Sequence, residues 1–324
     1  MARIVNKALE TALRRESLRD ELARKIVARF GGEGEEATAV PGFSLYRRSA
    51  TTACASATYM PRLVLFVQGE KRVTLGKTTY TCGPAEFMLT SVDLPVVSQV
   101  TKASRSEPIV GVLLRLEMPV IRKILSEEEF PARQLSLNTR GETREDTRGL
   151  AVGAATPELL GACIRLVDLL EEPEGIAFLS RLIQREIIYR LLRSPQGAHL
   201  AAIATLGEQS NRTARVVAWL RTNYASPLRV EELAEMAQMG VSTLHHHFRG
   251  LTAMSPLQYQ KQLRLHSARE RMLAEGMDAA SAAYSVGYES ASQFNREYSR
   301  FFGVPPMRDV KAHRAAGGAA ASTV

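Results

Sequence analysis

The sequence predicts an α+β protein: a strand-rich N-terminal domain with flanking helices, followed by an all-α domain of two helix-turn-helix units joined by a long helix. Two observations predict this division. Short runs of β-forming residues separated by Gly and Pro fill residues 38–116. Helical periodicity with an internal repeat fills residues 211–314. A length of 324 residues, 45% of them hydrophobic, is sufficient for two such domains.

The chain opens with a predicted amphipathic helix over residues 9–30, and the sequence GGEGEE at 31–36 then breaks its pattern. We therefore expect residues 1–37 to form a helix and a linker. This start lacks the apolar core of a signal peptide, and no stretch approaches the roughly 20 apolar residues of a membrane span. Three widely spaced cysteines form neither a disulfide framework nor a zinc pattern. We expect a cytoplasmic protein without membrane contact.

Six or more short β-type runs follow, with turn residues such as Gly69, Gly76 and Pro95 between them. Strands of this length and spacing indicate a small barrel or a sandwich, which we place at residues 38–155. The predicted strands are Leu63–Val67, Lys71–Leu75, Thr78–Thr81, Glu86–Leu89, Val96–Val100 and Ile109–Leu116.

Helical patterns return after the strands. Residues 117–130 form one predicted helix, and residues 133–149 form a predicted polar surface loop. Two further helices with apolar stripes are predicted at 156–171 and 175–192. These stripes are interpreted as core or as a dimer interface, and we assign residues 156–200 to a helical dimerisation or linker region.

The internal repeat is the most informative feature of the chain. Leu233–Pro256 and Ala282–Pro306 are two copies of one pattern. Each copy has a short helix of small residues, a turn at Gly240 or Gly287, and a second helix with a buried pair at i and i+4. The pairs are Leu244 with Phe248, and Phe294 with Tyr298. Helix-turn-helix units are therefore predicted at about 230–251 and 279–302, with Ser242, and Ser290 or Ser292, placed to cap the second helices.

The polar face of each second helix is the candidate DNA contact, because this helix lies in the major groove in helix-turn-helix proteins. A formal net charge of +8 also favours an anionic partner, nucleic acid or anionic lipid. Gln and Arg can form paired hydrogen bonds with base edges, whereas Ser and Thr more often bind phosphate. The candidates are Ser242, Thr243, His245, His246 and Arg249 in the first unit, and Ser292, Gln293, Asn295, Arg296 and Arg300 in the second. Three consecutive histidines, His245–His247, cannot face one metal ion on a helix.

Motifs over residues 213–311 resemble the DNA-binding domain of the AraC/XylS family. They are LA-x-x-A-x-M-x-x-S-x-L (Leu233–Leu244), SP-x-x-Y (Ser255–Tyr259), RL-x-x-A (Arg264–Ala268), VGY-x-S-x-S-x-F-x-R (Val286–Arg296) and FFG-x-x-P (Phe301–Pro306). The resemblance implies one helix, here Leu257–Ala274, between the units of a DNA-binding domain at 210–314. Its length of about 27 Å is near the ~34 Å between successive major-groove faces, so one chain could read two neighbouring groove segments. Because the two units are not symmetry mates, the DNA site should be directional. Family members often carry Arg two residues before the buried aromatic residue; Arg296 keeps it, whereas His246 replaces it.

The segment Tyr59–Val96 resembles the N-terminal domain of one subgroup of the same family, a cupin-like β-barrel, and the similarity extends over residues 20–200. The resemblance implies a transcription regulator with a small-molecule effector in the barrel. Activation is the usual mode of the family, so the resemblance implies an activator. Promoter DNA, RNA polymerase, the effector and a second copy of the chain are the implied partners, and the nucleoid is the implied location.

Two other functions remain as alternatives: a cupin-type enzyme with a DNA-binding tail, and an architectural DNA-binding protein without a ligand. Metal-binding cupins use several histidines, and His199 is the only histidine before His245, so we expect no metal, cofactor or catalytic residue. Cys54 and Cys82 are candidate redox or effector sensors, although two buried structural cysteines are favoured because no basic cluster lies beside them in the sequence. The last residues, 315–324, are expected to be disordered.

Overall fold

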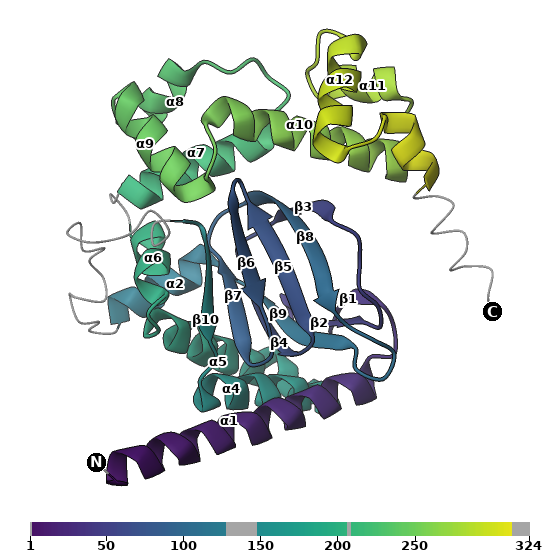
Figure 1. Ribbon diagram of the computed structural model, residues 1–324. Coiled ribbons are helices and arrows are strands. Elements are labelled where there is room, and N and C mark those ends of the chain that lie inside the picture. The colour runs from purple at the N-terminus through teal and green to yellow at the C-terminus, as the bar shows by residue number, and fades with distance from the viewer. Residues whose placement is uncertain (1, 128–147, 206–208, 313–324) are drawn as a thin grey trace.

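The computed structural model describes residues 2–127, 148–205 and 209–312 (Figure 1). The predicted disordered tail and nearly all of the predicted polar loop at 133–149 lie outside these residues. In Figure 1 two β-sheets occupy the middle of the molecule, with N-terminal helices on one side and the C-terminal helices at the opposite end. The predicted α+β class is confirmed.

The described strands form two antiparallel sheets, ordered β1-β2-β9-β4-β7-β10 and β3-β8-β5-β6. No described ladder joins the edge strands of one sheet to those of the other. The expected cupin-like barrel is therefore wrong in one respect: the domain is a two-sheet sandwich, not a closed barrel. The strands are β1 (Gly34–Ala37), β2 (Phe43–Arg48), β3 (Ala55–Tyr59), β4 (Arg62–Gln68), β5 (Glu70–Leu75), β6 (Thr78–Cys82), β7 (Glu86–Thr90), β8 (Leu94–Lys102), β9 (Ile109–Arg115) and β10 (Leu150–Ala154).

All six predicted strands are present, as β4 to β9. Strands β1, β2, β3 and β10 were not predicted, and β1 lies in the stretch expected to be a linker. Strands β1 and β3 lie at sheet edges and bury few side chains, so their sequences lack a strong apolar signal. Pro95, expected in a turn, is instead the second residue of β8.

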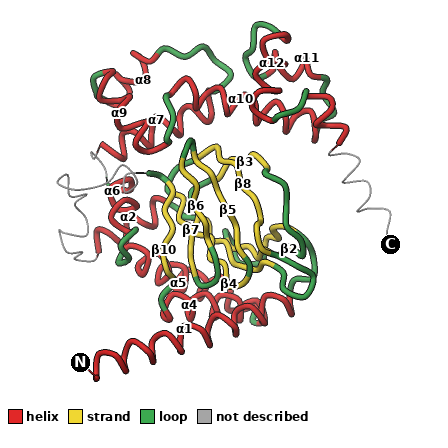
Figure 2. The backbone as a smooth tube through the Cα atoms, in the orientation of Figure 1, coloured by secondary structure: helices red, strands yellow, loops and turns green. Residues whose placement is uncertain are grey.

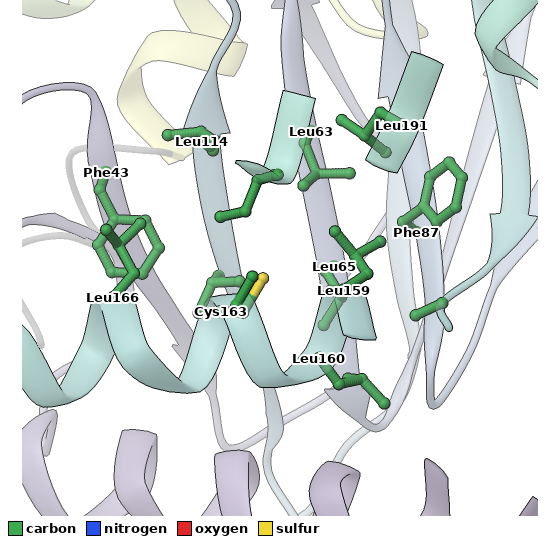
Figure 3. Close-up of a cluster of buried hydrophobic side chains, with 14 of the residues drawn as sticks. Phe43, Leu63, Leu65, Phe87, Leu114, Leu159, Leu160, Cys163, Leu166 and Leu191 are labelled. Carbon is green, nitrogen blue, oxygen red and sulfur yellow. The ribbon is translucent and has the colours of Figure 1, made fainter. Parts of the chain in front are cut away.

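The central strands of the larger sheet are buried on both faces. In β4, Leu63, Leu65 and Val67 face the N-terminal helices, whereas Val64 and Phe66 face the space between the sheets. This explains the continuous apolar run in β4, which an alternating half-exposed strand would not have. Figure 3 shows part of the first core, where side chains from β2, β4, β7 and β9 gather against helices α4 and α5.

Helix α1 (Ala2–Arg29) packs along α4 with its C-terminal half, where Leu22 and Ile26 are buried. Leu9 and Leu13, predicted on the same apolar stripe, are 57% and 59% exposed. The other helices before the C-terminal domain are α2 (Met118–Glu127), α4 (Pro157–Asp168) with a 3-10 turn (Leu169–Glu171), α5 (Pro173–Leu192) and α6 (Gly197–Ala204). Helix α6 was not predicted as a separate element.

The C-terminal part is all-helical, as the tube in Figure 2 makes plain. Helix α10 begins one residue earlier than the predicted linking helix. A capping box between Ser255 and Gln258 caps its N-terminus. The helices are α7 (Gln209–Asn223), α8 (Val230–Ala237), α9 (Val241–Thr252), α10 (Pro256–Ala274), α11 (Ala279–Ser285) and α12 (Ala291–Phe302). Two helix-turn-helix units joined by one long helix are therefore confirmed.

The two units differ in what they pack against. Buried residues of the first unit, such as Leu244 and Phe248, belong to one continuous core with residues between the two sheets. The core of the second unit, around Phe294 and Tyr298, contains no sheet residue. Helix α10 contributes Leu263 to the first core and Leu265 to the second. The sheet domain therefore packs directly against the first unit and is connected to the second unit through α10.

Candidate DNA-binding interface

The turn of the first unit differs in detail from the expectation. Gln238, at the end of α8, carries the left-handed backbone with φ of 53°, and Gly240 has an ordinary φ of −67°. Gly240 is also the N-cap of α9, and no side chain caps this helix, so the expected cap by Ser242 is wrong. Ser242 lies too far inside the helix to accept from its first free N–H groups.

The second unit has the expected turn. Gly287 adopts φ of +89°, and a Cβ at this position would lie 2.0 Å from the carbonyl oxygen of Ala225, so only glycine fits. The hydroxyl of Ser290 accepts a hydrogen bond from the backbone N–H of Gln293 at 3.3 Å and caps α12. Of the two serines considered for this cap, Ser290 holds the position and Ser292 does not.

The predicted buried pairs hold the two recognition helices in place. Leu244 and Phe248 in α9, and Phe294 and Tyr298 in α12, are fully buried. The hydroxyl of Tyr298 also donates a hydrogen bond of 2.7 Å to the carboxylate of Asp309. This packing fixes which faces of α9 and α12 point outward.

The ten candidate DNA contacts lie on these outward faces, and all are exposed except His245, which is half-buried. A cleft of about 1190 Å³ brings four of them together: His245, His246 and Arg249 from α9, and Arg300 from α12. The other candidates do not line this cleft. Gln293 lines a separate pocket beside Lys261 and Glu297. The remaining five candidates, Ser242, Thr243, Ser292, Asn295 and Arg296, line neither the cleft nor this pocket.

Three cations that the sequence did not single out also line the cleft. Lys261 comes from α10, Lys77 from the β5–β6 turn, and Arg148 from the segment before β10. Lys261 could have been found from its place in the linking helix. Lys77 and Arg148 gave no signal, because only the folding of the sheet domain against the first unit brings them near α9.

One acidic residue, Glu297, lies on the second recognition helix. Its carboxylate accepts hydrogen bonds from Lys261 at 2.9 Å, Tyr288 at 2.9 Å and Gln293 at 3.3 Å. Burial raises the pKa of Glu297, but these three donors outweigh burial and hold the pKa below its usual value. Glu297 is therefore ionised at neutral pH and orients Gln293.

The three consecutive histidines point to different surroundings, as expected. His246 is exposed, whereas His245 and His247 are half-buried, and burial lowers the pKa of His247. Among residues 2–127, 148–205 and 209–312, no group of three or more His, Cys, Asp or Glu residues is arranged to hold a metal ion.

Close contacts between backbone and side chains, as well as the shared core, join the sheet domain to the DNA-binding domain. The backbone N–H of Gly149 donates to the carbonyl of Leu251 at the end of α9 at 2.8 Å. Arg221 of α7 donates to the carboxylate of Asp93 at 2.7 Å. A Cβ at Gly76 would lie 2.9 Å from Ala253, so the β5–β6 turn is in close contact with the residue after α9. The sheet domain thus contacts the DNA-binding domain at each of these points.

The cysteines have unlike environments. Cys82 is buried, and burial raises the pKa of its thiol, whereas Cys54 is exposed. The favoured interpretation of two buried cysteines thus fits Cys82 alone. Cys163, in the core of α4, is also buried, and burial raises its pKa to about 12. Both buried thiols remain protonated at neutral pH and are poor nucleophiles.

Two helix-turn-helix units joined by one helix, with polar faces exposed, are typical of a DNA-binding protein. Residues 39–199 match the family described as AraC-type transcriptional regulator N-terminus, and residues 233–311 match a helix-turn-helix domain family. The chain belongs to the AraC-type transcriptional regulators, as its motifs predicted.

Individual relatives agree with this assignment. The chain is 26% identical over 247 residues to the HTH-type transcriptional regulator ExsA of Pseudomonas aeruginosa, covering 75% of this chain and 84% of ExsA. It is 27% identical over 151 residues to the activator RhaS of Escherichia coli, covering 46% of this chain and about half, 53%, of RhaS. The structure of ToxT from Vibrio cholerae has the same fold, with a TM-score of 0.54 and 13% identity over 83% of this chain and 97% of ToxT. None of the described helices is long and apolar enough to cross a membrane.

Proposed function

We propose that this regulator binds a directional promoter site, with α9 and α12 in successive segments of the major groove. The observation that carries this proposal is the continuity of α10, whose 19 residues hold both units. At ~1.5 Å per residue the helix is about 28 Å long, close to the ~34 Å that separates major-groove faces on one side of the duplex. The two units are unequal in sequence and packing, so the site is not a palindrome.

Within this site we assign different roles to the exposed residues. Gln293 and Arg296 of α12 read base edges, since both side chains can form paired hydrogen bonds with a base. On α9, His246 takes the corresponding position. The remaining candidates contact the phosphate backbone or flank these residues: Ser242, Thr243, His245, Arg249, Ser292, Asn295 and Arg300.

Footprinting of the full chain on DNA from upstream of its target genes tests the proposal. We expect protection of two adjacent major-groove segments on one face of the duplex, and a strand-specific orientation. Protection of a single segment, or failure to bind any upstream fragment at low salt, contradicts it. Arg249→Ala and Arg296→Ala should each weaken protection of a different segment.

The output and its control are part of the same proposal. The regulator acts as an activator through RNA polymerase in the cytoplasm, and a small-molecule effector bound by the sheet domain sets its activity; no enzymatic reaction is required. The regulatory unit comprises residues 38–155 and is preceded by the helix and strand of residues 1–37. The DNA-binding unit comprises residues 210–314.

Replacing Cys54 or Cys82 by Ser tests the hypothesis that one of these thiols is a sensor. Unchanged induction of a reporter rules out a role for the replaced thiol.

Dimerisation through residues 156–200 is proposed as well. Helix α5 exposes Phe178 (70%), Leu179 (39%) and Leu182 (50%) on one face, although its opposite face is well buried. Clustered large apolar side chains on a helix surface are typical of protein contacts. A second copy of the chain would cover this face.

A further inference from the structure

A cavity of about 220 Å³ lies between the two sheets. Strands β1, β2, β3, β4, β5, β7 and β9 all contribute to its wall, and Glu35 of β1 is the acidic residue among the lining residues. Much of this wall is apolar, formed by Ala57, Val64, Phe66, Met88 and Leu113. The volume is below the ~300–1,000 Å³ of pockets for drug-sized ligands, so the occupant must be small.

One cation, Lys71 of β5, lines this cavity without an acidic partner. Its ammonium lies 5.0 Å from the centroid of the Tyr46 ring and 5.6 Å from that of Tyr59. No described carboxylate lies within ion-pair distance of it, whereas the cavity's other cation, Arg62, is paired with Glu35 at 3.0 Å. The side chains on the cavity wall therefore leave one positive charge uncompensated.

The charge of Lys71 persists at neutral pH. Burial lowers the pKa of its ammonium, but the neighbouring Tyr59 and Tyr46 outweigh this effect and the pKa lies above its usual value. An ammonium removed from water is stabilised by aromatic faces only in part, and an anion supplies the missing charge.

A second polar group lies beside Lys71 at the cavity. The hydroxyl of Tyr59 is buried, and its nearest polar neighbour is the Lys71 ammonium, whose pKa is raised in part by a hydrogen bond with Tyr59. Buried hydroxyl groups in folded proteins normally have more than one polar neighbour, so this hydroxyl can also serve a bound group. Lys71 and Tyr59 thus offer a cationic donor and a neutral donor on the wall of a cavity that also has an apolar side.

We propose that this cavity binds a small organic carboxylate, with its carboxylate on the Lys71 ammonium and the Tyr59 hydroxyl and its apolar body against Phe66, Met88 and Leu113. This inference rests on the proposed effector role of the sheet domain and names the class of ligand. A neutral polyol fits less well, because the apolar wall leaves most of its hydroxyl groups without partners. A cationic ligand is repelled by Lys71.

Titration calorimetry of the full chain with benzoate and its neutral isostere benzamide tests the proposal. We expect benzoate to bind and benzamide to bind at least about tenfold more weakly, since a charge-assisted hydrogen bond is lost. Lys71→Met should weaken benzoate binding by a similar factor. Lys123→Met, which removes an exposed lysine of α2, is the matched control and should leave benzoate binding unchanged.

Tyr59→Phe provides a second variant in case Lys71→Met does not fold. It removes only the Tyr59 hydroxyl and keeps the ring, and should weaken benzoate binding several-fold. Equal binding of benzoate and benzamide, or unchanged benzoate binding in folded Lys71→Met or in Tyr59→Phe, overturns the proposal. So does failure of both benzoate and butyrate to bind, or inorganic phosphate displacing benzoate at equal concentration.

Footprinting on the same preparations separates the two proposals. If carboxylates fail to bind but the footprint persists, the ligand class is wrong and the DNA-binding function stands. If the footprint is absent while benzoate binds through Lys71, the ligand site stands and the proposed promoter site is wrong.

Discussion

The hydroxyl of Tyr259 in α10 donates a hydrogen bond of 2.7 Å to the backbone carbonyl of Asp93, just before β8. The carboxylate of the same Asp93 accepts from Arg221 of α7 at 2.7 Å. One residue of the sheet domain therefore holds two helices of the DNA-binding domain. Because Tyr259 also packs edge-on against Phe248 of α9 at 5.5 Å, this contact is coupled to the first recognition helix.

Tyr259→Phe should lower the free energy of unfolding by about 1–2 kcal/mol, because it leaves the buried Asp93 carbonyl without its donor while keeping the ring. Chemical denaturation of the full chain measures the change. Tyr284→Phe is the matched control, since Tyr284 is 57% exposed and should change stability little. Equal effects of the two substitutions would show that the Tyr259 hydroxyl contributes nothing.

Arg221→Ala should destabilise the protein more than Asp93→Asn. Burial raises the pKa of Asp93, and Arg221 only partly opposes this effect, so an unpaired Asp93 carboxylate would be costly. Arg221→Ala should lower the free energy of unfolding by about 2 kcal/mol. Asp93→Asn should have a smaller effect, because the side chain of Arg221 is 44% exposed and water can solvate it when its partner is lost. Because the pKa of Asp93 is higher in the folded protein than in the unfolded chain, stability falls as the pH rises through the range between these two values. Asp93→Asn should abolish this pH dependence. Denaturation at several pH values measures both effects.

Arg296→Ala should relax specificity at one end of the DNA site. A paired hydrogen bond to a base contributes ~1–3 kcal/mol of discrimination, so single base changes in that half-site should lose most of their effect in the variant. Fluorescence anisotropy with a set of single-substitution duplexes measures this. If affinity falls equally for every sequence, Arg296 is a phosphate contact and its assigned role is wrong.

Stability should decline below about pH 6 through His266. Burial, with a smaller effect of Arg269, lowers the pKa of His266 to about 4, and its Nε2 has no hydrogen-bond partner among the described residues. The unfolded chain binds the proton near pH 6.5, so stability contributed by neutral His266 is present above that pH and lost as pH falls toward 4. The difference is at most roughly 3 kcal/mol. His266→Leu should flatten the pH dependence of the free energy of unfolding. If this pH dependence is unchanged in the variant, His266 is not its source.

Leu182→Glu should disrupt the proposed dimer by placing a charge on the exposed apolar face of α5. Analytical ultracentrifugation of the full chain should show a dimer that becomes monomeric in this variant. Leu13→Glu on α1, which alters an equally exposed leucine elsewhere, should leave the dimer intact. A monomeric wild-type protein at high concentration would contradict the proposal.

The sequence determined the elements whose signal is local. The copies of the helix-turn-helix pattern, fifty residues apart at Leu244 and Phe294, identified both recognition helices and their buried pairs, because i and i+4 residues share one helical face. Central strands such as β4 and β9 were found because their apolar runs are long. The outward faces of α9 and α12 followed from these buried pairs, so nearly all candidate contacts are exposed as predicted.

Tertiary structure decided what depends on contacts between distant segments. Edge strand β1 forms because it pairs with β2, although its own sequence, GEEA, is polar. The sheets stay open rather than closing into a barrel. The docking of α7 and α10 on Asp93, which lies 166 residues before Tyr259, depends on the packing of strands and helices. The meeting of Lys71 with Tyr59 and Tyr46 does so too. Local periodicity reports which face of an element is buried, but the partner of that face is fixed by the free energy of the whole fold.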